Sequence, residues 1–234
     1  MKTSNKLLIG LLSIIFFTIN AIIIDLKVFG VHHSERKIVK NEKFFPLEKF
    51  HHISIKDRRK NRISPYIKIK CSDKNLIKNE NYADKMLYSF VHQIINDTLK
   101  IVSQDDQPFM HEFTILTNSK IQSINTDKSN IEIEGFRQDY LRIYQNQGQL
   151  RCNGNDSRKR SKFNKLNITQ NDAYMKLQNI HVDTLEINMI KSRTEFDGDI
   201  AMLNAKIMNH SKLQLRNVAE LNFKKDDSSK IHFN

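Results

Sequence analysis

The carboxy-terminal half of the chain repeats a short unit in which two apolar residues flank one polar residue. The second apolar positions form two interleaved series, Ile115, Ile133, Cys152, Leu177, Phe196, Leu215, Phe233 and Ile124, Ile143, Ile168, Ile187, Ala205, Phe223. Successive members are 18 or 19 residues apart, except for one step of 25 in each series. With the residues two places earlier there are 26 positions, of which 22 are large and apolar, whereas a 39% apolar composition would supply about ten.

A constant period of this length indicates stacked structural repeats. Alternation puts the two apolar side chains on one face of a short strand and the polar one on the other. If each strand bonds to its equivalent in the next repeat, about 4.8 Å away, the stack encloses an apolar interior that no single repeat buries alone. The sequence therefore predicts an all-β fold, a single-stack β-solenoid with about two short strands per 18–19-residue coil.

The corners of these coils need residues that tolerate turn conformations, and the chain has only 6 glycines. Asparagine and serine supply such positions because they accept left-handed backbone and bond their own main chain. We expect the turns at Asn130, Asn146, Asn171, Asn179, Asn209, Asn217 and Ser228. Both 25-residue steps cross residues 153–164, which predicts a loop inserted into one coil there.

The segment before the repeat, residues 44–71, carries the same alternation in two short runs. Ile53 and Ile55 form the first run, and Ile67 and Ile69 form the second. Alternating isoleucines of this kind are typical of strands with one buried face. These runs are therefore predicted to be the first strands of the domain.

Residues 82–95 follow a different pattern, with apolar residues at helical spacing. They are Tyr82, Met86, Leu87, Phe90, Val91, Ile94 and Ile95. The spacing predicts a short helix that would cap the amino-terminal end of the stack, where an open edge would otherwise invite association. A strand at 99–102 follows, and the whole β-solenoid domain is expected to span residues 44–234.

The amino terminus has the character of a membrane segment. Residues 7–24 contain no charge and are bounded by Lys6 and Asp25. As a helix this run would be about 27 Å long, close to the thickness of a hydrocarbon core. We expect residues 1–25 to form a signal anchor or transmembrane helix, followed by a basic linker at 26–43.

Long carboxy-terminal domains are translocated largely regardless of their charge. The protein is therefore predicted to be a single-pass protein of the cell membrane, with its domain on the non-cytoplasmic, periplasmic side. A cleaved signal peptide, which would leave a secreted or periplasmic protein, is the alternative.

The order of motifs resembles a known family. An F-x-x-I-x-I strand at Phe50, Ile53 and Ile55 is followed by an I-x-I strand, an N-D-x-L-x-I strand beginning at Asn96, and then stacked L-x-I coils. This order resembles the head GIN domain family of bacterial auto-transporter adhesins, over residues 44–234, as a divergent glycine-poor member. The resemblance implies a β-helical, exported domain with no established enzymatic role, and it supplies no catalytic or ligand-binding residue.

The formal net charge of +12 is concentrated in two blocks. Residues 32–70 hold 12 Lys and Arg against 4 Asp and Glu, and residues 151–165 hold 6 against 1. Two separate basic blocks in an exported chain do not form the continuous groove that nucleic acid needs. No nucleic-acid partner is expected.

The sequence offers no motif for catalysis, a cofactor or a metal. It lacks the G-x-S-x-G, G-x-x-x-x-G-K-[ST] and G-x-G-x-x-G patterns, and its nine histidines include no H-E-x-x-H. Cys71 and Cys152 have no CxxC partner, and each ends an alternating run where a small buried hydrophobe is expected. A disulfide between them is an alternative that the compartment permits.

The basic insertion is the one local candidate for binding. It reads RCNGNDSRKRSKFNK, and its cations are Arg151, Arg158, Lys159, Arg160, Lys162 and Lys165. A basic loop on a regular stack can bind an acidic glycan, an anionic lipid or an acidic envelope protein. A solvent-exposed loop without a binding role is the alternative.

These observations favour a non-catalytic, membrane-anchored domain of the cell envelope with a structural, adhesion-like or ligand-binding role. The alternative is a polysaccharide lyase or hydrolase, since β-solenoids host such enzymes. That activity needs acidic and basic residues that converge on neighbouring coils. The outward positions Lys176, Glu186, Glu195, Lys212 and Arg216 are too mixed to define such a site.

The placement outside the cytoplasm can be tested on intact spheroplasts. Protease or a membrane-impermeant thiol reagent is expected to reach the domain, because the only predicted membrane segment precedes it. Complete protection of the domain would reverse the orientation.

Overall fold

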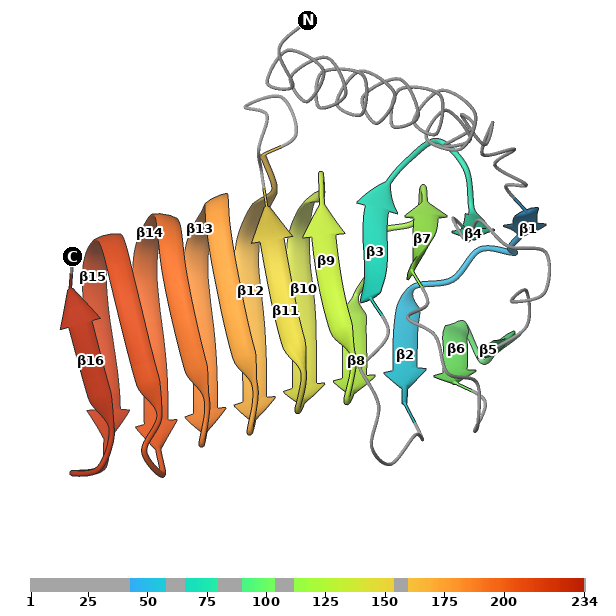
Figure 1. The fold of residues 1–234 in the computed structure, drawn as a ribbon. Coiled ribbons are helices and arrows are strands. Elements are labelled where there is room, and N and C mark those ends of the chain that lie inside the picture. Colours follow the sequence, from blue (N-terminus) through green and yellow to red (C-terminus); the bar gives the residue numbers. More distant parts are fainter. Residues whose placement is uncertain (1–42, 58–65, 80–89, 104–111, 154–159, 234) are drawn as a thin grey trace, which may run out of the picture. The chain divides into compact units, whose positions relative to one another are not determined.

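The computed structural model describes residues 43–57, 66–79, 90–103, 112–153 and 160–233 (Figure 1). Over these ranges the fold is all-β, as predicted, and all regular elements are strands. The predicted membrane segment 7–24 and nearly all of the linker 26–43 lie outside them. Across the ranges given above, the chain contains no helix with the length and apolar character needed to span a membrane.

The strands lie in two rows that pair mainly in parallel. The bounds are β1 Lys43–Pro46, β2 His52–Lys56, β3 Tyr66–Cys71, β4 Leu76–Asn79, β5 Phe90–Ile95, β6 Thr98–Ser103, β7 Glu112–Thr117, β8 Ser123–Asp127, β9 Asn130–Glu134, β10 Arg137–Asn146, β11 Gln149–Asn153, β12 Lys162–Asn171, β13 Tyr174–Ile190, β14 Arg193–Met208, β15 Lys212–Lys225 and β16 Lys230–Phe233. Row 1 comprises β7, β3, β9, β11, the first parts of β13, β14 and β15, and β16. Row 2 comprises β6, β2, β8, β10, β12 and the second parts of β13, β14 and β15.

The inward side chains of successive turns line up in columns along the stack. In row 2, Ile124, Ile143, Ile168, Ile187, Ala205 and Phe223 are direct strand-to-strand partners. In row 1 the column is Ile133, Cys152, Leu177, Phe196, Leu215 and Phe233. All members except the two terminal phenylalanines are buried, and each buried Ile or Leu stabilises the fold by about 1.5–3 kcal/mol. This alignment matches the spacing read from the sequence.

The amino-terminal strands are threaded into the stack out of chain order. β3 lies between β7 and β9, so Ile69 separates Ile115 from Ile133. The direct Ile115-to-Ile133 step that the spacing suggested is therefore wrong. Parallel pairing needs only matching alternation, and the Ile67–Ile69 run supplies it as well as any later coil does. In row 2, β2 lies between β6 and β8 in the same way.

The predicted capping helix at 82–95 is wrong over its last six residues, and residues 82–89 lie outside the described ranges. Residues 90–95 form β5, which pairs antiparallel with β6. Asn96 and Asp97 both have positive φ, 47° and 62°, which is the geometry of a two-residue hairpin turn. That turn prevents the helix expected from the spacing, because it folds residues 90–95 back against β6, which begins at Thr98.

The corners use left-handed residues, partly at the expected asparagines. Asn179, Asn209 and Asn217 have positive φ, as predicted. Asn146 and Asn171 instead end strands. The left-handed residue is the next one, Gln147 or Asp172.

Gly148 forms one of these corners, where close packing against the previous turn restricts the residue in addition to the left-handed backbone. Its φ is +81°, and a Cβ there would lie 2.3 Å from the Ser129 carbonyl oxygen of the previous turn. Gly135 has nearly the same φ, +80°, but a Cβ there would meet only the Cys71 Cβ at 3.8 Å. Of these two left-handed glycines, only Gly148 therefore has this close approach of backbone to backbone.

We predict that Gly148→Ala lowers the free energy of unfolding by about 3 kcal/mol or more, because it combines left-handed strain with a steric clash. Gly135→Ala, which adds the strain alone, should cost about 1 kcal/mol. Urea denaturation followed by circular dichroism measures both values. Equal losses for the two variants would contradict the packing described at Gly148.

The two cysteines are free and differ in environment. Cys152 is 3% exposed within the row 1 column, as expected for a small buried hydrophobe, and burial raises the pKa of its thiol to about 12. Cys71 was expected to be buried as well, but it is exposed, because it is the last residue of β3 and the chain leaves the row there. The structure contains no Cys71–Cys152 disulfide.

A thiol reagent such as dithionitrobenzoate at pH 8 should therefore react with one thiol of the native chain and with two after unfolding. Cys71→Ser should remove the fast-reacting thiol. Equal rates for both thiols in the native chain would show that Cys152 is not enclosed.

Candidate functional site

The described cations of the basic insertion are divided between the two rows. Arg151 lies on β11 in row 1, whereas Lys162 and Lys165 lie on β12 in row 2. Arg160 lies two residues before the start of β12. Arg158 and Lys159 lie outside the described residues. The insertion therefore replaces a corner between the rows, and its cations border that corner from both sides.

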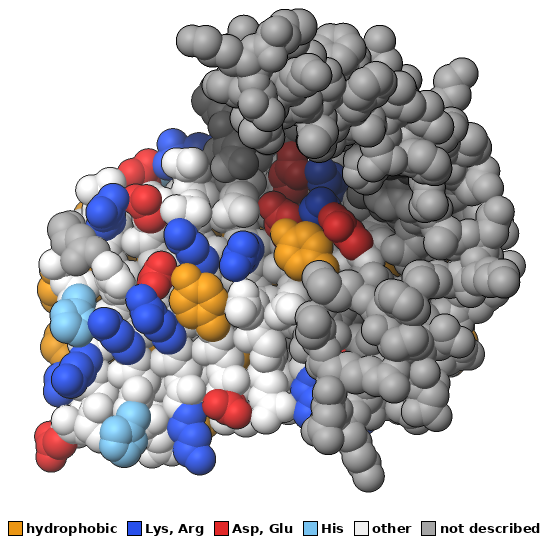
Figure 2. All heavy atoms as spheres, viewed as in Figure 1, with side chains coloured by type: hydrophobic (Ala, Val, Ile, Leu, Met, Phe, Trp, Pro, Cys, Tyr) orange, Lys and Arg blue, Asp and Glu red, His pale blue; other side chains and the backbone are white. Residues whose placement is uncertain are grey.

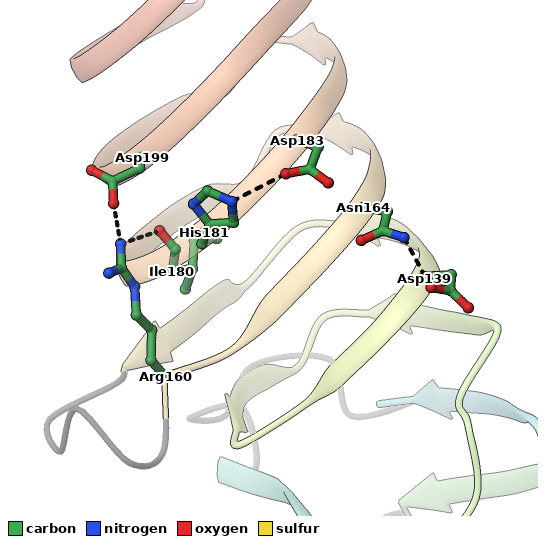
Figure 3. A network of polar contacts seen from close by, with 7 residues as sticks. All are labelled: Asp139, Arg160, Asn164, Ile180, His181, Asp183 and Asp199. Carbon is green, nitrogen blue, oxygen red and sulfur yellow. Dashed lines mark hydrogen bonds and ion pairs between the residues drawn. The ribbon is translucent and has the colours of Figure 1, made fainter.

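Two of these cations are paired with acids of later turns. Arg160 forms an ion pair with Asp199 on β14 and donates a 3.4 Å hydrogen bond to the Ile180 carbonyl (Figure 3). The Lys165 Nζ lies 2.7 Å from the Glu186 carboxylate on β13. Both pairs are largely exposed, so each contributes at most about 1 kcal/mol. The Lys165 pair ties two adjacent turns together, and the Arg160 pair reaches one turn farther, to β14. Both pairs reduce the free positive charge at the base of the insertion.

A polar groove lies on the outward side of row 2, on strands β2, β8, β10 and β12. We call it the Tyr144 groove; its volume is ≈ 520 Å³, and its polar lining is Ser54, Lys56, Asn125, Thr126, Asp127, Tyr144, Asn146 and Asn171. The Tyr144 side chain is 48% exposed. The neighbouring Leu141 and Ile143 are buried in the core, as the sequence indicated.

One edge of the groove is a ladder of side-chain hydrogen bonds, one link for each turn. Asn171 Nδ2 donates to Asn146 Oδ1 at 2.9 Å, and Asn146 Nδ2 donates to Asp127 Oδ1 at 2.9 Å. These bonds fix the three side chains before any ligand arrives. The groove therefore presents donors and acceptors at positions set by the spacing of the strands.

This arrangement can hold a polar ring. An exposed tyrosine offers an apolar ring face and a hydroxyl, and the amides beside it both donate and accept hydrogen bonds. Lys56 adds a cation at the same groove. This site is only weakly visible in the sequence. Tyr144 and Asn146 stand at alternate positions of β10, but their neighbours Lys56 and Asn171 are far away in the chain.

Two further grooves lie nearer the carboxy-terminal end. One, of ≈ 390 Å³ on row 2, is lined by Asn167, Glu186, Asn188, Asn204, Lys206, Asn222 and Phe223, with Ile187 and Ala205 at its base. The other, of ≈ 270 Å³ on row 1, is lined by Lys176, Gln178, Glu195, Phe196, Asp197, Gln214 and Arg216. Row 2 is thus rich in amides along much of its length.

The outward face of row 1 is charged instead (Figure 2). Lys and Arg side chains stand among Asp and Glu over this face. The acids pair with the bases beside them, Arg193 with Glu195 at 2.5 Å and Arg216 with Asp197 at 3.7 Å. Within the described ranges, no three His, Cys, Asp or Glu side chains come together as a metal site would require.

Solved structures share this fold. A putative adhesin from Bacteroides fragilis has a TM-score of 0.56 at 14% identity, covering 82% of this chain and 96% of that one. A putative adhesin from Parabacteroides distasonis has a TM-score of 0.52 at 10% identity, covering 83% and 94%. A protein named as a putative lipid binding protein, also from Parabacteroides distasonis, has a TM-score of 0.50 at 15% identity, covering 83% and 93%.

No family model and no curated protein matches the sequence. At identities of 10–15% the structural likeness shows the fold alone. The protein therefore shares its all-β architecture with solved bacterial proteins named as putative adhesins and as a putative lipid binding protein.

Proposed function

We propose that residues 44–234 are a non-catalytic β-solenoid domain of the cell envelope with an adhesion-like role, related to the head GIN domains. The parallel register of successive turns and the fold shared with the putative adhesin from Bacteroides fragilis support this proposal. Residues 7–24 would hold the domain at the outer side of the cell membrane.

The ligand we propose is an acidic glycan bound along row 2. The Tyr144 groove carries this proposal, because it joins an exposed aromatic ring to a lysine and to a fixed ladder of two amides, whose third member is the Asp127 carboxylate. One sugar ring would pack on Tyr144, its hydroxyls would bond Asn146 and Asn171, and a carboxylate or sulfate of the glycan would face Lys56. The amide-rich groove farther along row 2 would extend the contact to further sugars.

The insertion is assigned a lesser role in this proposal. Arg160 and Lys165 are engaged with Asp199 and Glu186, so they are less available to a ligand. Arg158 and Lys159 remain candidates for binding acidic partners. An anionic lipid is the other ligand class to test, since one structural neighbour is named for lipid binding.

Binding can be measured by isothermal titration of the full chain with uronate oligomers and sulfated glycosaminoglycan fragments. We predict that Tyr144→Ala weakens binding at least tenfold, since it removes the ring that packs on the sugar. Tyr174→Ala is the matched control, because Tyr174 is an outward tyrosine of row 1. It should leave the affinity unchanged.

Other outcomes would contradict parts of this proposal. Equal losses for Tyr144→Ala and Tyr174→Ala would exclude the Tyr144 groove. Loss of binding in Arg158→Ser/Lys159→Ser alone would place the site on the insertion. Formation of unsaturated or shortened sugars during the titration would contradict a non-catalytic role, and binding to anionic vesicles without glycan binding would favour a lipid ligand.

A further inference from the structure

The outward face of row 1 carries a line of cations across strands β11, β13, β14, β15 and β16. Each of these strands contributes one member, in the order Arg151, Lys176, Arg193, Lys212 and Lys230. At about 4.8 Å per strand, the line runs for about 19 Å along the stack. We call these residues, together with Arg216 on the same face of β15, the basic face.

Several of these cations are direct neighbours of like charge. Arg151 pairs in register with Lys176, and Lys212 pairs in register with both Arg193 and Lys230. Like charges on directly opposite residues of neighbouring strands destabilise a sheet. The basic face therefore has an arrangement that an anionic partner would relieve.

The other part of row 1, on β7, β3 and β9, does not share this arrangement. There Lys68 forms an ion pair with Glu112, and the Lys70 Nζ lies 2.8 Å from the Glu134 carboxylate. Glu132 adds a further acid between them. The charges of row 1 are thus segregated along the stack, with the positive charge gathered on β11 and β13–β16.

The acids on the basic face do not neutralise it. The described ones are Glu195 and Asp197, and each is paired with an arginine of the same face. By contrast, Lys176, Lys212 and Lys230 form no ion pair with any residue that the structure describes. These three ammonium groups remain available to a partner.

The basic face is a surface rather than a single thread of charge. Lys212 and Arg216 stand four residues apart on β15, which is about 13 Å along the strand. Figure 2 shows Lys and Arg side chains spread across this face. Tyr174 lies among them, with the Arg193 guanidinium 5.9 Å from its ring centre. Lysines on long apolar stems around an amphipathic ring suit the headgroup region of a bilayer.

We propose that the basic face lies against the anionic headgroups of a lipid bilayer, with the stack axis along the bilayer plane. Lys and Arg side chains donate charge-assisted hydrogen bonds to phosphate oxygens, and clustered cations are attracted to anionic lipid within about a Debye length. Phosphates between the cations offset the like-charge neighbours. Row 2 then faces away from the bilayer and leaves the Tyr144 groove open, but the contact itself does not depend on glycan binding.

Energy transfer in vesicles tests this orientation with the full chain. In a Cys71→Ser background, a donor dye is attached to Gln214→Cys on row 1 or to Asn222→Cys on row 2, both on β15, while Cys152 stays enclosed. The acceptor is a headgroup-labelled lipid. In vesicles of phosphatidylglycerol and phosphatidylcholine, transfer should be greater from residue 214 than from residue 222. This difference should disappear in phosphatidylcholine alone, and also in 1 M salt, where the Debye length is about 3 Å.

Charge reversal identifies the cations that make the contact. Lys176→Glu/Lys212→Glu should remove the greater transfer from residue 214, because it replaces two of the free cations by acids. Lys100→Glu/Lys224→Glu changes the net charge equally on the outward face of row 2, and it should leave that transfer unchanged. None of the four lysines is buried, and circular dichroism checks that both variants keep the fold.

Three results would overturn the proposal. Equal transfer from the two labels in anionic vesicles, or greater transfer from residue 222, would show that row 1 does not face the bilayer. A difference that persists in phosphatidylcholine alone would show that charge does not cause it. Equal effects of the two double variants would show a response to net charge, and binding of a soluble acidic polymer without any orientation on vesicles would assign the basic face to that class of partner instead.

Discussion

The structure depends on the alignment of inward apolar side chains from one turn to the next. No turn encloses its own interior, so Ile168 is buried only because Ile143 and Ile187 lie directly beside it in row 2. A slip of one residue would turn every inward side chain outward, which fixes the register of each added turn. Buried polar side chains are also aligned from turn to turn. Gln170 donates a hydrogen bond to Gln145 at 3.3 Å and accepts one from Thr194.

The regular interior also determines what the surface can do. Outward side chains recur at the spacing of the strands, so residues far apart in sequence become neighbours with fixed separations, as in the Asp127–Asn146–Asn171 ladder. Ion pairs such as that between Arg160 and Asp199 connect turns that are not adjacent in the stack. Binding on such a scaffold needs little rearrangement, because the groups that meet the ligand are already held in place.

The repeat could be predicted because one physical requirement, burial of two side chains per strand, governs almost every turn after Ser123. The amino-terminal strands could not be ordered in this way. Ile53 and Ile67 belong to the same alternation as any later strand, and no local feature of the sequence indicates that β2 and β3 pair between strands that follow them in the chain.

The helix expected at 82–95 is wrong at residues 90–95, because the turn at Asn96 and Asp97 pairs β5 with β6. The basic residues of the insertion could be recognised in the sequence, but the acids that pair with Arg160 and Lys165 lie on later turns. Most of the residues that line the Tyr144 groove likewise come much later in the chain than Lys56 does.

Distances between spin labels along one outward column of row 2 test the alignment most directly. Lys206 can be paired in turn with Asn125, Ser54 and Lys100, which stand four, five and six strands away from it. At about 4.8 Å per strand, pulsed electron resonance should give backbone separations of about 19, 24 and 29 Å. Residue 100 should thus be farther from Lys206 than residue 54 is, although it is nearer in sequence. Distances that do not rise evenly, or a shorter distance to residue 100 than to residue 54, would contradict the stacked register.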